Sequence, residues 1–139
     1  RAVEDSVRNR REDPIPETIP SFSLDREKLD AYLSLKNKVA DIMTQDAGII
    51  RTENGLQEGL ENLLRLEQTE IFEENEYYSL VSKNLLTVAE LIIRSALFRK
   101  ESRGGHFRSD YPTPNDDYVC HIIQQKGKEI KTTPVILNN

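Results

Sequence analysis

The apolar residues of this chain recur at intervals of three and four in three separate stretches, which is the spacing of one face of an α-helix. The first stretch runs from about Asp25 to Gln45, and Ser23 or Asp25 can cap its beginning. Its apolar positions are Leu29, Tyr32, Leu35, Val39 and Ile42. One such stripe predicts a helix that packs against one neighbour.

The second stretch follows the interruption "DAGIIR" and begins after Thr52, whose hydroxyl group can cap a helix. Its apolar positions are Leu56, Leu60, Leu63 and Leu64. We expect an amphipathic helix shorter than about 20 residues. Gly55 and Gly59 either weaken this helix or allow another segment to pack closely against it.

The third stretch, from about Asn75 to Lys100, contains "LLTVAELIIRSALF" and has apolar residues on two faces. One face carries Val81, Leu85, Val88, Ile92 and Ala96, and the other carries Leu86, Ala89, Ile93 and Leu97. Two apolar faces predict two neighbours, so we expect the central helix of a bundle, with small residues such as Ser95 permitting close approach. The pair Gly104-Gly105 is predicted to end this helix.

The two ends of the chain have different patterns. Residues 1–11 have a short apolar stripe typical of the last turns of a helix, and three prolines make residues 12–21 an extended linker. Near the other end, "YVCHIIQQ" and "KEIKTTPVI" predict two strands joined by a tight turn at Lys126-Gly127. The expected fold is all-α: an antiparallel, spectrin-repeat-like three-helix bundle over residues 23–112, preceded by a linker over 1–22, with a small β-hairpin and tail over 113–139.

Composition limits the function. The 139 residues suit one domain, and the net charge of −5 disfavours a nucleic-acid or anionic-membrane surface. No apolar run reaches the length of about 20 residues that a membrane span needs. The single Cys120 cannot form an internal disulfide, which favours a reducing cytoplasm. The chain opens at Arg1 without a signal-peptide pattern, and we interpret it as a piece of a longer cytoplasmic protein.

Polar chemistry is concentrated directly after the third helix, in "RKESRGGHFRSDYP". Arg99 and Lys100 would lie in the last helical turn, where cations interact favourably with the helix dipole. The density of charge beyond them favours an ion-pair network, because arginine can bind carboxylates bidentately on another domain. A second hypothesis is that His106 and an arginine hold a dicarboxylate.

Other polar residues offer less chemistry. Cys120 and His121 are adjacent in a predicted strand, so they point to opposite faces and cannot form a nucleophile pair. Asp116 and Asp117 follow Pro114 and read as part of a turn. The sequence has no G-x-G-x-x-G loop for a dinucleotide and no zinc-ligand spacing. We therefore expect no cofactor-binding or metal-binding residue in this chain.

The stretch "NLLTVAELIIRSALFRKESRGGHFRSDYP" resembles the C-terminal helical domain of the succinate dehydrogenase, fumarate reductase and L-aspartate oxidase flavoprotein family, which carries an R-x-E-S-R-G-x-H-x-R-x-D signature after a long helix. The matching residues are Arg99, Glu101, Ser102, Arg103, Gly104, His106, Arg108 and Asp110. "DAGIIRTENGLQEGL" resembles the family's G-I-V-R stretch, and "RAVEDSV" resembles the helix that closes its FAD domain. The resemblance covers about Asp25 to the C-terminus.

The resemblance implies a function for the complete protein. "AELIIRSAL" and the ending Asp110-Tyr111-Pro112 look most like the L-aspartate oxidase branch, whose members oxidise L-aspartate to iminoaspartate in quinolinate and NAD synthesis, passing hydride to FAD and then electrons to oxygen or fumarate. FAD would be bound by FAD-binding and capping domains absent from this chain, so the fragment alone would be inactive. The runners-up are a fumarate reductase or succinate dehydrogenase subunit and a free-standing module that binds an acidic partner or RNA.

The resemblance also gives the signature a role. We expect it to dock the bundle onto the flavin domain rather than to perform chemistry. The predicted docking residues are Arg99, Glu101, Ser102, Arg103, His106, Arg108 and Asp110.

Overall fold

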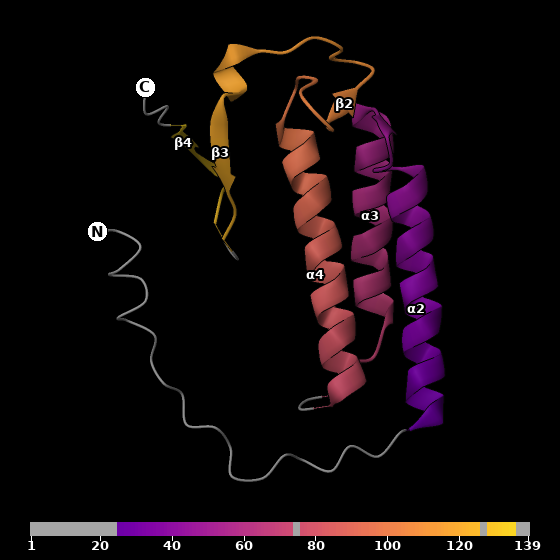
Figure 1. The fold of residues 1–139 in the computed structure, drawn as a ribbon. Helices are drawn as coiled ribbons and strands as arrows, with labels where there is room; N and C mark the ends of the chain where they lie inside the picture. Colours follow the sequence, from indigo (N-terminus) through magenta and orange to yellow (C-terminus); the bar gives the residue numbers. More distant parts are fainter. Residues whose placement is uncertain (1–24, 74–75, 126–127, 136–139) are drawn as a thin grey trace, which may run out of the picture.

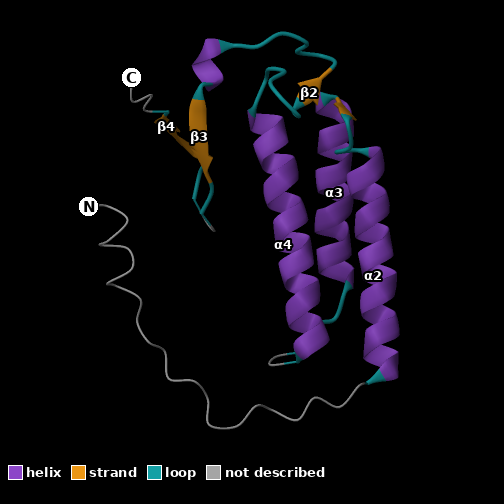
Figure 2. Cartoon of the chain, viewed as in Figure 1, coloured by secondary structure: helices purple, strands orange, loops and turns teal. Residues whose placement is uncertain are grey.

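The computed structural model describes residues 25–73, 76–125 and 128–135. Three helices, α2 (Arg26–Gln45), α3 (Glu53–Thr69) and α4 (Tyr77–Phe98), lie side by side, and each contacts the other two (Figure 1). The remaining elements are β1 (Ile50–Arg51), β2 (Phe107–Arg108), the 3-10 turn η1 (Asp116–Tyr118), β3 (Cys120–Ile123) and β4 (Lys131–Pro134). The chain is therefore mainly helical with small strands, as the sequence predicted (Figure 2). In the described ranges, no helix combines the length and apolarity that a bilayer crossing requires.

Side-chain caps fix where the helices begin. The Asp25 carboxylate accepts the Lys28 N–H at 3.2 Å, which decides between the two predicted caps of α2. The Thr52 hydroxyl accepts the Gly55 N–H at 3.1 Å, as predicted for α3. At α4 the cap is Glu76, whose carboxylate accepts the Ser79 N–H at 2.6 Å. The expected start at Asn75 lies outside the described residues.

One apolar core joins the three helices. Its buried members are Leu35, Val39, Ala47, Leu56, Leu63, Leu86, Ala89, Ile93 and Ala96. A Cβ atom on Gly59 would lie 2.7 Å from Cβ of Asp46 and 3.2 Å from Cδ1 of Ile93, so this glycine serves close packing. Of the two apolar faces predicted for α4, one is buried in this core. α4 has the two predicted neighbours, α2 and α3. On its other predicted face, Val88 is 54% and Ile92 is 44% exposed.

The end of α4 differs from the prediction. The helix stops at Phe98, and Arg99 is its C-cap, with its N–H donating to the Ser95 carbonyl at 3.1 Å. Lys100 is not helical, and the glycines do not end the helix. Gly104, with φ of 58°, instead allows a tight turn in which Arg103 and His106 exchange backbone hydrogen bonds. The chain leaves the helix early because its next residues enter a hydrogen-bonded loop.

The strands were only partly predicted. β1 and β2 pair in parallel, with Ile50 opposite Phe107 and Arg51 opposite Arg108, and this pairing was not expected. β3 and β4 form the expected antiparallel hairpin, in which Ile123 lies opposite Lys131. Beyond this pair the Lys128 N–H donates to the Gln125 carbonyl at 3.0 Å, which fits the predicted turn, and Lys126-Gly127 themselves lie outside the described residues. Cys120 is half-buried and His121 exposed, consistent with opposite faces.

Candidate functional site

Arg108 is the centre of a polar cluster at the end of the bundle. Its side chain is completely buried. Nη1 donates to the Ala96 carbonyl at 3.0 Å, near the end of α4, and Nη2 donates to the Glu53 carboxylate at 2.8 Å, at the start of α3. The strand pair β1–β2 positions Arg108 between the two helix ends. One guanidinium group therefore joins α4 to α3.

Asp110 completes this junction. Its two carboxylate oxygens accept Nε and Nη2 of Arg108 at 2.8 and 2.7 Å, which is a bidentate pair. Its Oδ2 also accepts the Glu53 N–H at 2.8 Å, at the positive end of the α3 dipole. The hydrogen bonds from Arg108 hold the pKa of Asp110 well below its usual value, although burial opposes this. The carboxylate is therefore ionised at neutral pH.

Glu101 forms a second junction and is also completely buried. Its carboxylate accepts the Asn115 N–H at 2.8 Å and the Arg103 Nε at 3.1 Å, and it pairs with Arg99. Burial opposes ionisation of Glu101, but these donors outweigh it and lower its pKa. Glu101 is therefore a buried anion that holds the loop after α4 against the C-terminal segment.

Arg99 and Ser102 extend the cluster. Arg99 donates through Nη1 to the Tyr118 carbonyl at 2.7 Å and through Nη2 to the Cys120 carbonyl at 3.2 Å, so it fixes the start of β3. The Ser102 hydroxyl accepts the Arg108 N–H at 2.9 Å and donates to the Tyr111 carbonyl at 2.8 Å. These hydrogen bonds join separate parts of the loop after α4. We call the cluster of Glu53, Arg99, Glu101, Ser102, Arg103, Arg108 and Asp110 the ion network.

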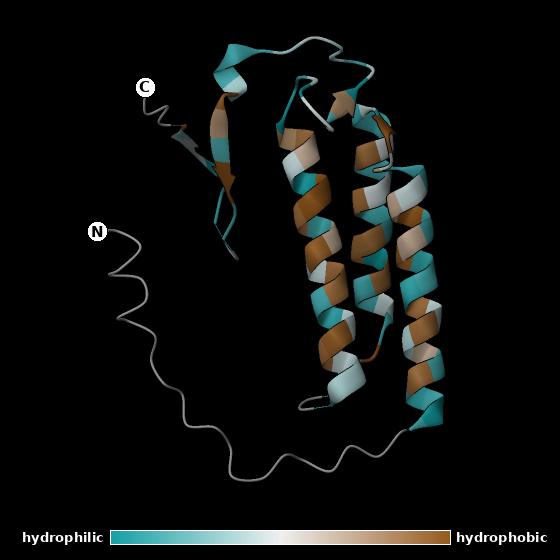
Figure 3. Cartoon of the chain, in the orientation of Figure 1, coloured by the Kyte–Doolittle hydropathy of each residue, from teal (hydrophilic) through white to brown (hydrophobic). Residues whose placement is uncertain are grey.

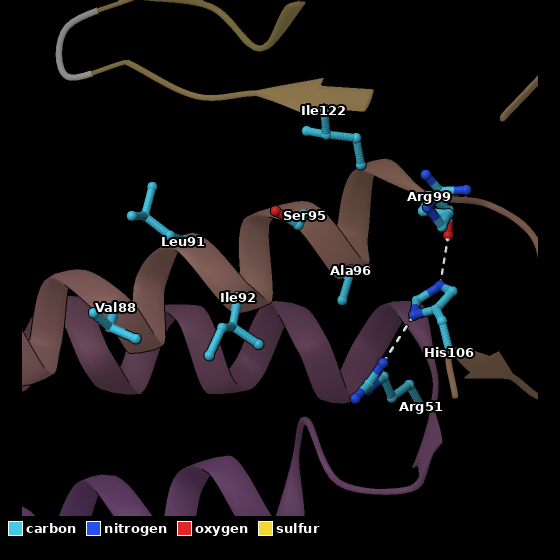
Figure 4. Close-up of a pocket in the computed structure, with 9 residues that line it drawn as sticks. All are labelled: Arg51, Val88, Leu91, Ile92, Ser95, Ala96, Arg99, His106 and Ile122. Carbon is cyan, nitrogen blue, oxygen red and sulfur yellow. Dashed lines mark hydrogen bonds between the residues drawn. The ribbon is translucent and has the colours of Figure 1, made fainter. Parts of the chain in front are cut away.

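His106 lies beside the ion network, between two arginines (Figure 4). Its Nδ1 is 2.8 Å from Nη1 of Arg51, and its Nε2 is 3.1 Å from the Arg99 carbonyl. Because arginine only donates, Nδ1 must accept, and Nε2 carries the hydrogen and donates to the carbonyl. Burial and the positive charges of Arg51 and Arg108 lower the pKa of His106, against the bond to Arg99. The geometry therefore selects the neutral imidazole.

An open pocket of about 400 Å³ lies next to His106 (Figure 4). It is lined by Arg51, Val88, Leu91, Ile92, Ser95, Ala96, Arg99, His106 and Ile122. The α4 residues form an apolar floor, Ile122 of β3 faces them, and the arginines and His106 lie at one end. Within the described ranges, no cluster of histidine, cysteine and acidic residues is arranged to bind a metal ion. The lining has no phosphate-binding loop, so these residues do not fit FAD.

All seven predicted docking residues come together in this region, counting His106 at its edge. Glu101, Ser102 and Arg108 are buried and use their polar groups within the chain, whereas the Arg103 side chain is 40% exposed. Asp116, predicted as part of a turn, belongs to η1 and lies 3.6 Å from Arg103.

Sequence reasoning missed three participants, Arg51, Glu53 and Asn115. Arg51 had a signal, because it ends the "DAGIIR" stretch already noted for its family resemblance. Glu53 lies in the same family-like stretch, but an acid in a first helical turn and an asparagine in a turn are common, so neither Glu53 nor Asn115 was singled out.

Comparisons with known proteins agree on one group. The sequence profile described as "Fumarate reductase flavoprotein C-term" matches residues 36–139. An uncharacterized FAD-dependent oxidoreductase of Methanocaldococcus jannaschii is 36% identical over 112 residues, 73% of this chain and 20% of that protein. The L-aspartate oxidase of Acinetobacter baylyi is 33% identical over 129 residues, 87% of this chain and 23% of that protein.

A solved structure has the same fold. The E. coli quinol fumarate reductase subunit FrdA superposes with a TM-score of 0.63 at 22% identity, over 77% of this chain and 21% of that chain. At this identity the likeness concerns the fold alone. The chain spans about a fifth of the length of the curated relatives described above.

Proposed function

The chain belongs to the fumarate reductase flavoprotein C-terminal family, and from this premise we propose that it is the C-terminal helical domain of a cytoplasmic, FAD-dependent L-aspartate oxidase. The observation that carries this proposal is the 33% identity over 87% of the chain to the L-aspartate oxidase of Acinetobacter baylyi. The complete protein would convert L-aspartate to iminoaspartate for quinolinate and NAD synthesis. FAD would supply the hydride acceptor, and oxygen or fumarate would reoxidise it.

In this proposal the domain is structural and inactive alone. Residues 1–22 are the linker and the end of a preceding FAD-domain helix, 23–112 the bundle, and 113–139 its hairpin and tail. The ion network holds the loop after α4 rigid, so that the partly exposed Arg103 and His106 contact the FAD-binding and capping domains. The absence of a phosphate-binding loop from the sequence supports a cofactor site in those domains.

We also propose that the three helices run antiparallel, as in a spectrin repeat. The short connections over residues 46–52 and 70–76 support this arrangement, because a short link returns the chain alongside the helix it has left. The progression of the sequence colours along neighbouring helices in Figure 1 supports it as well.

The test of the activity uses the full-length protein that contains this chain. We expect it to bind FAD and to oxidise L-aspartate, with oxygen or fumarate as acceptor, and to leave succinate unoxidised. Oxidation of succinate without oxidation of aspartate would instead establish the second candidate, a fumarate reductase or succinate dehydrogenase subunit. The description of the matching family favours that candidate.

The test of docking uses two substitutions in the same protein. Arg103→Ala and His106→Ala each remove a contact at the proposed interface, so we expect lower thermal stability and weaker FAD retention. Lys36→Ala, at an exposed position of α2, is the control and should change neither. Unchanged stability, FAD retention and activity in both test variants would refute the docking role.

A further inference from the structure

The hairpin of β3 and β4 lies beside α4 without entering the apolar core (Figure 1). Among the described residues, the core and the partly buried side chains packed against it end at Leu97. β4 is exposed along its whole length, and Figure 3 shows hydrophobic colour along much of α4 but interrupted by hydrophilic colour on β3. A hairpin of two strands is marginally stable by itself, so its attachment to the helices decides how it behaves.

The start of the hairpin is attached to the bundle through the ion network. The buried Glu101 carboxylate accepts the Asn115 N–H at 2.8 Å. Arg99 donates to the Tyr118 carbonyl at 2.7 Å and to the Cys120 carbonyl at 3.2 Å. Hydrogen bonds in which one partner is ionised are roughly twice as strong as neutral ones. The ion network therefore holds this end of the hairpin firmly.

The far end of β3 has a weaker attachment, which is a neutral amide. The Gln124 side-chain nitrogen donates to the Leu91 carbonyl at 2.8 Å and to the Ser95 hydroxyl at 2.6 Å. Over residues 121–125 and 128–135, no other hydrogen bond or ion pair reaches a helix. The two ends of the hairpin therefore differ in strength, with charged anchors at the start and one uncharged side chain at the far end.

The attachment at Gln124 also determines the shape of the pocket beside His106. Among the described residues of β3, only Ile122 lines this pocket, where it faces α4 across the apolar floor (Figure 4). The next residue, Ile123, points to the opposite face of the strand and is 45% exposed. Movement of β3 away from α4 would therefore remove one wall of the pocket and expose Leu91 and Ile92.

We propose that the β3–β4 hairpin is a hinged flap over this pocket. The flap turns about the ion network at its start, Gln124 latches it to α4, and its release opens the pocket while the three helices stay folded. Segments with few buried apolar contacts open locally at a lower free energy than the core does. The flap depends on contacts within this chain and not on the substrate of the complete protein.

Hydrogen exchange of the full-length protein that contains this chain, followed by mass spectrometry, tests whether the flap opens as one unit. Amides of β3 and β4 should share one protection factor, at least about tenfold below that of α4 around the buried Ile93. Gln124→Ala removes two hydrogen bonds to α4, so it should lower the protection of both strands about tenfold and leave α4 and the Arg108 amide unchanged. Gln125→Ala, at the exposed neighbouring position, is the matched control and should change none of these values.

Three results would overturn the flap. Equal protection factors for the hairpin and α4 would mean that they open together. Unchanged exchange of the hairpin in Gln124→Ala would mean that Gln124 is not the latch. An equal loss of protection at the Arg108 amide would mean that the loop after α4 detaches with the hairpin, so that the ion network is not the hinge.

Thiol labelling of the same protein tests whether release uncovers the pocket. In a Cys120→Ser background, we compare Ile122→Cys, on the pocket side of β3, with the matched control Ile123→Cys on the other side, and peptide mapping reads each site. Adding Gln124→Ala should speed the reaction of maleimide with Ile122→Cys about tenfold, because that thiol reacts mainly after opening, and should speed Ile123→Cys less than about twofold. Equal acceleration of the two thiols, or none at Ile122→Cys, would contradict the release of β3 from α4.

Discussion

Ile93 in the bundle and Arg108 beyond it have the same exposure, zero, but different forces hold them in place. Ile93 lies among the apolar side chains of three helices and contributes through the area that it removes from water. Arg108 contributes through hydrogen bonds to two carboxylates and a helix carbonyl. Its burial would be unfavourable if any of these partners were missing.

The difference shows that the helices and the loop after α4 are held by two different kinds of interaction. The helices need only apolar residues of suitable size, and many combinations satisfy that requirement. The loop after α4 needs particular donors opposite particular acceptors. Among the described residues, no buried side-chain nitrogen or oxygen lacks a hydrogen-bond partner. The apolar core therefore holds the three helices together, and the ion network specifies how the loop and the C-terminal segment sit on it.

Arg108→Met should give the largest loss and tests this division directly. Methionine fills much of the volume but leaves Glu53 and Asp110 as anions without their buried partner. We expect the free energy of unfolding of the 139-residue chain to fall by about 3–5 kcal/mol, measured by urea denaturation. A loss below about 1 kcal/mol would contradict a charge-held loop.

Ile93→Ala is the matched apolar comparison, with an expected loss of about 2–5 kcal/mol from the cavity that it leaves. Adding Asp110→Asn should recover part of the loss in Arg108→Met, because it removes one of the unpaired charges. The same addition should recover nothing in Ile93→Ala. If Asp110→Asn changed the free energy of unfolding equally in Arg108→Met and in Ile93→Ala, the two sites would not differ as we propose.

The same difference between the helices and the loop explains which structural features could be predicted from the sequence. The three helices follow from local spacing, and Thr52 was recognisable as a cap because capping depends on neighbours three residues away. The second apolar face of α4 was also recognisable, but which face would be buried within this chain was not. The parallel pairing of Ile50 with Phe107 joins strands of two residues across a long separation, and no local pattern encodes it.

The network was recognisable as a cluster but not as a set of contacts. Charge density in "RKESRGGHFRSDYP" and the family resemblance identified the residues, yet the partners of Arg108 depend on where the start of α3 lies in space. The end of α4 was misplaced for the same reason. The sequence predicts that the glycines end the helix, whereas the helix ends at Phe98, where the tertiary hydrogen bonds of Arg99 and Glu101 begin.

Glu101→Gln tests the second polar junction, and we expect a loss of unfolding free energy of intermediate size. Glutamine keeps the shape and one acceptor oxygen but removes the charge that binds Arg99 and Arg103. Hydrogen bonds to charged groups are worth about 1.5–3 kcal/mol, so we expect a loss of about 2 kcal/mol in urea denaturation. Because the pKa of Glu101 is lowered on folding, the carboxylate stabilises the chain above its ordinary value of 4.5, and this contribution disappears as the pH falls below it. Glu101→Gln should therefore lose less stability than the unmodified chain on acidification, and equal losses would contradict the assignment.

The smallest effect concerns His106, which lines the pocket beside the ion network. Its pKa lies below the ordinary value of 6.5 in the folded chain, so the unfolded chain binds a proton first as the pH falls. Stability should therefore be fully present above pH 6.5 and should decline below it, by less than the loss in Glu101→Gln. His106→Gln should flatten this decline in melting temperature, whereas His121→Gln, at an exposed position of β3, should retain it. If both variants kept the decline, the neutral imidazole between Arg51 and the Arg99 carbonyl would not be the group that titrates.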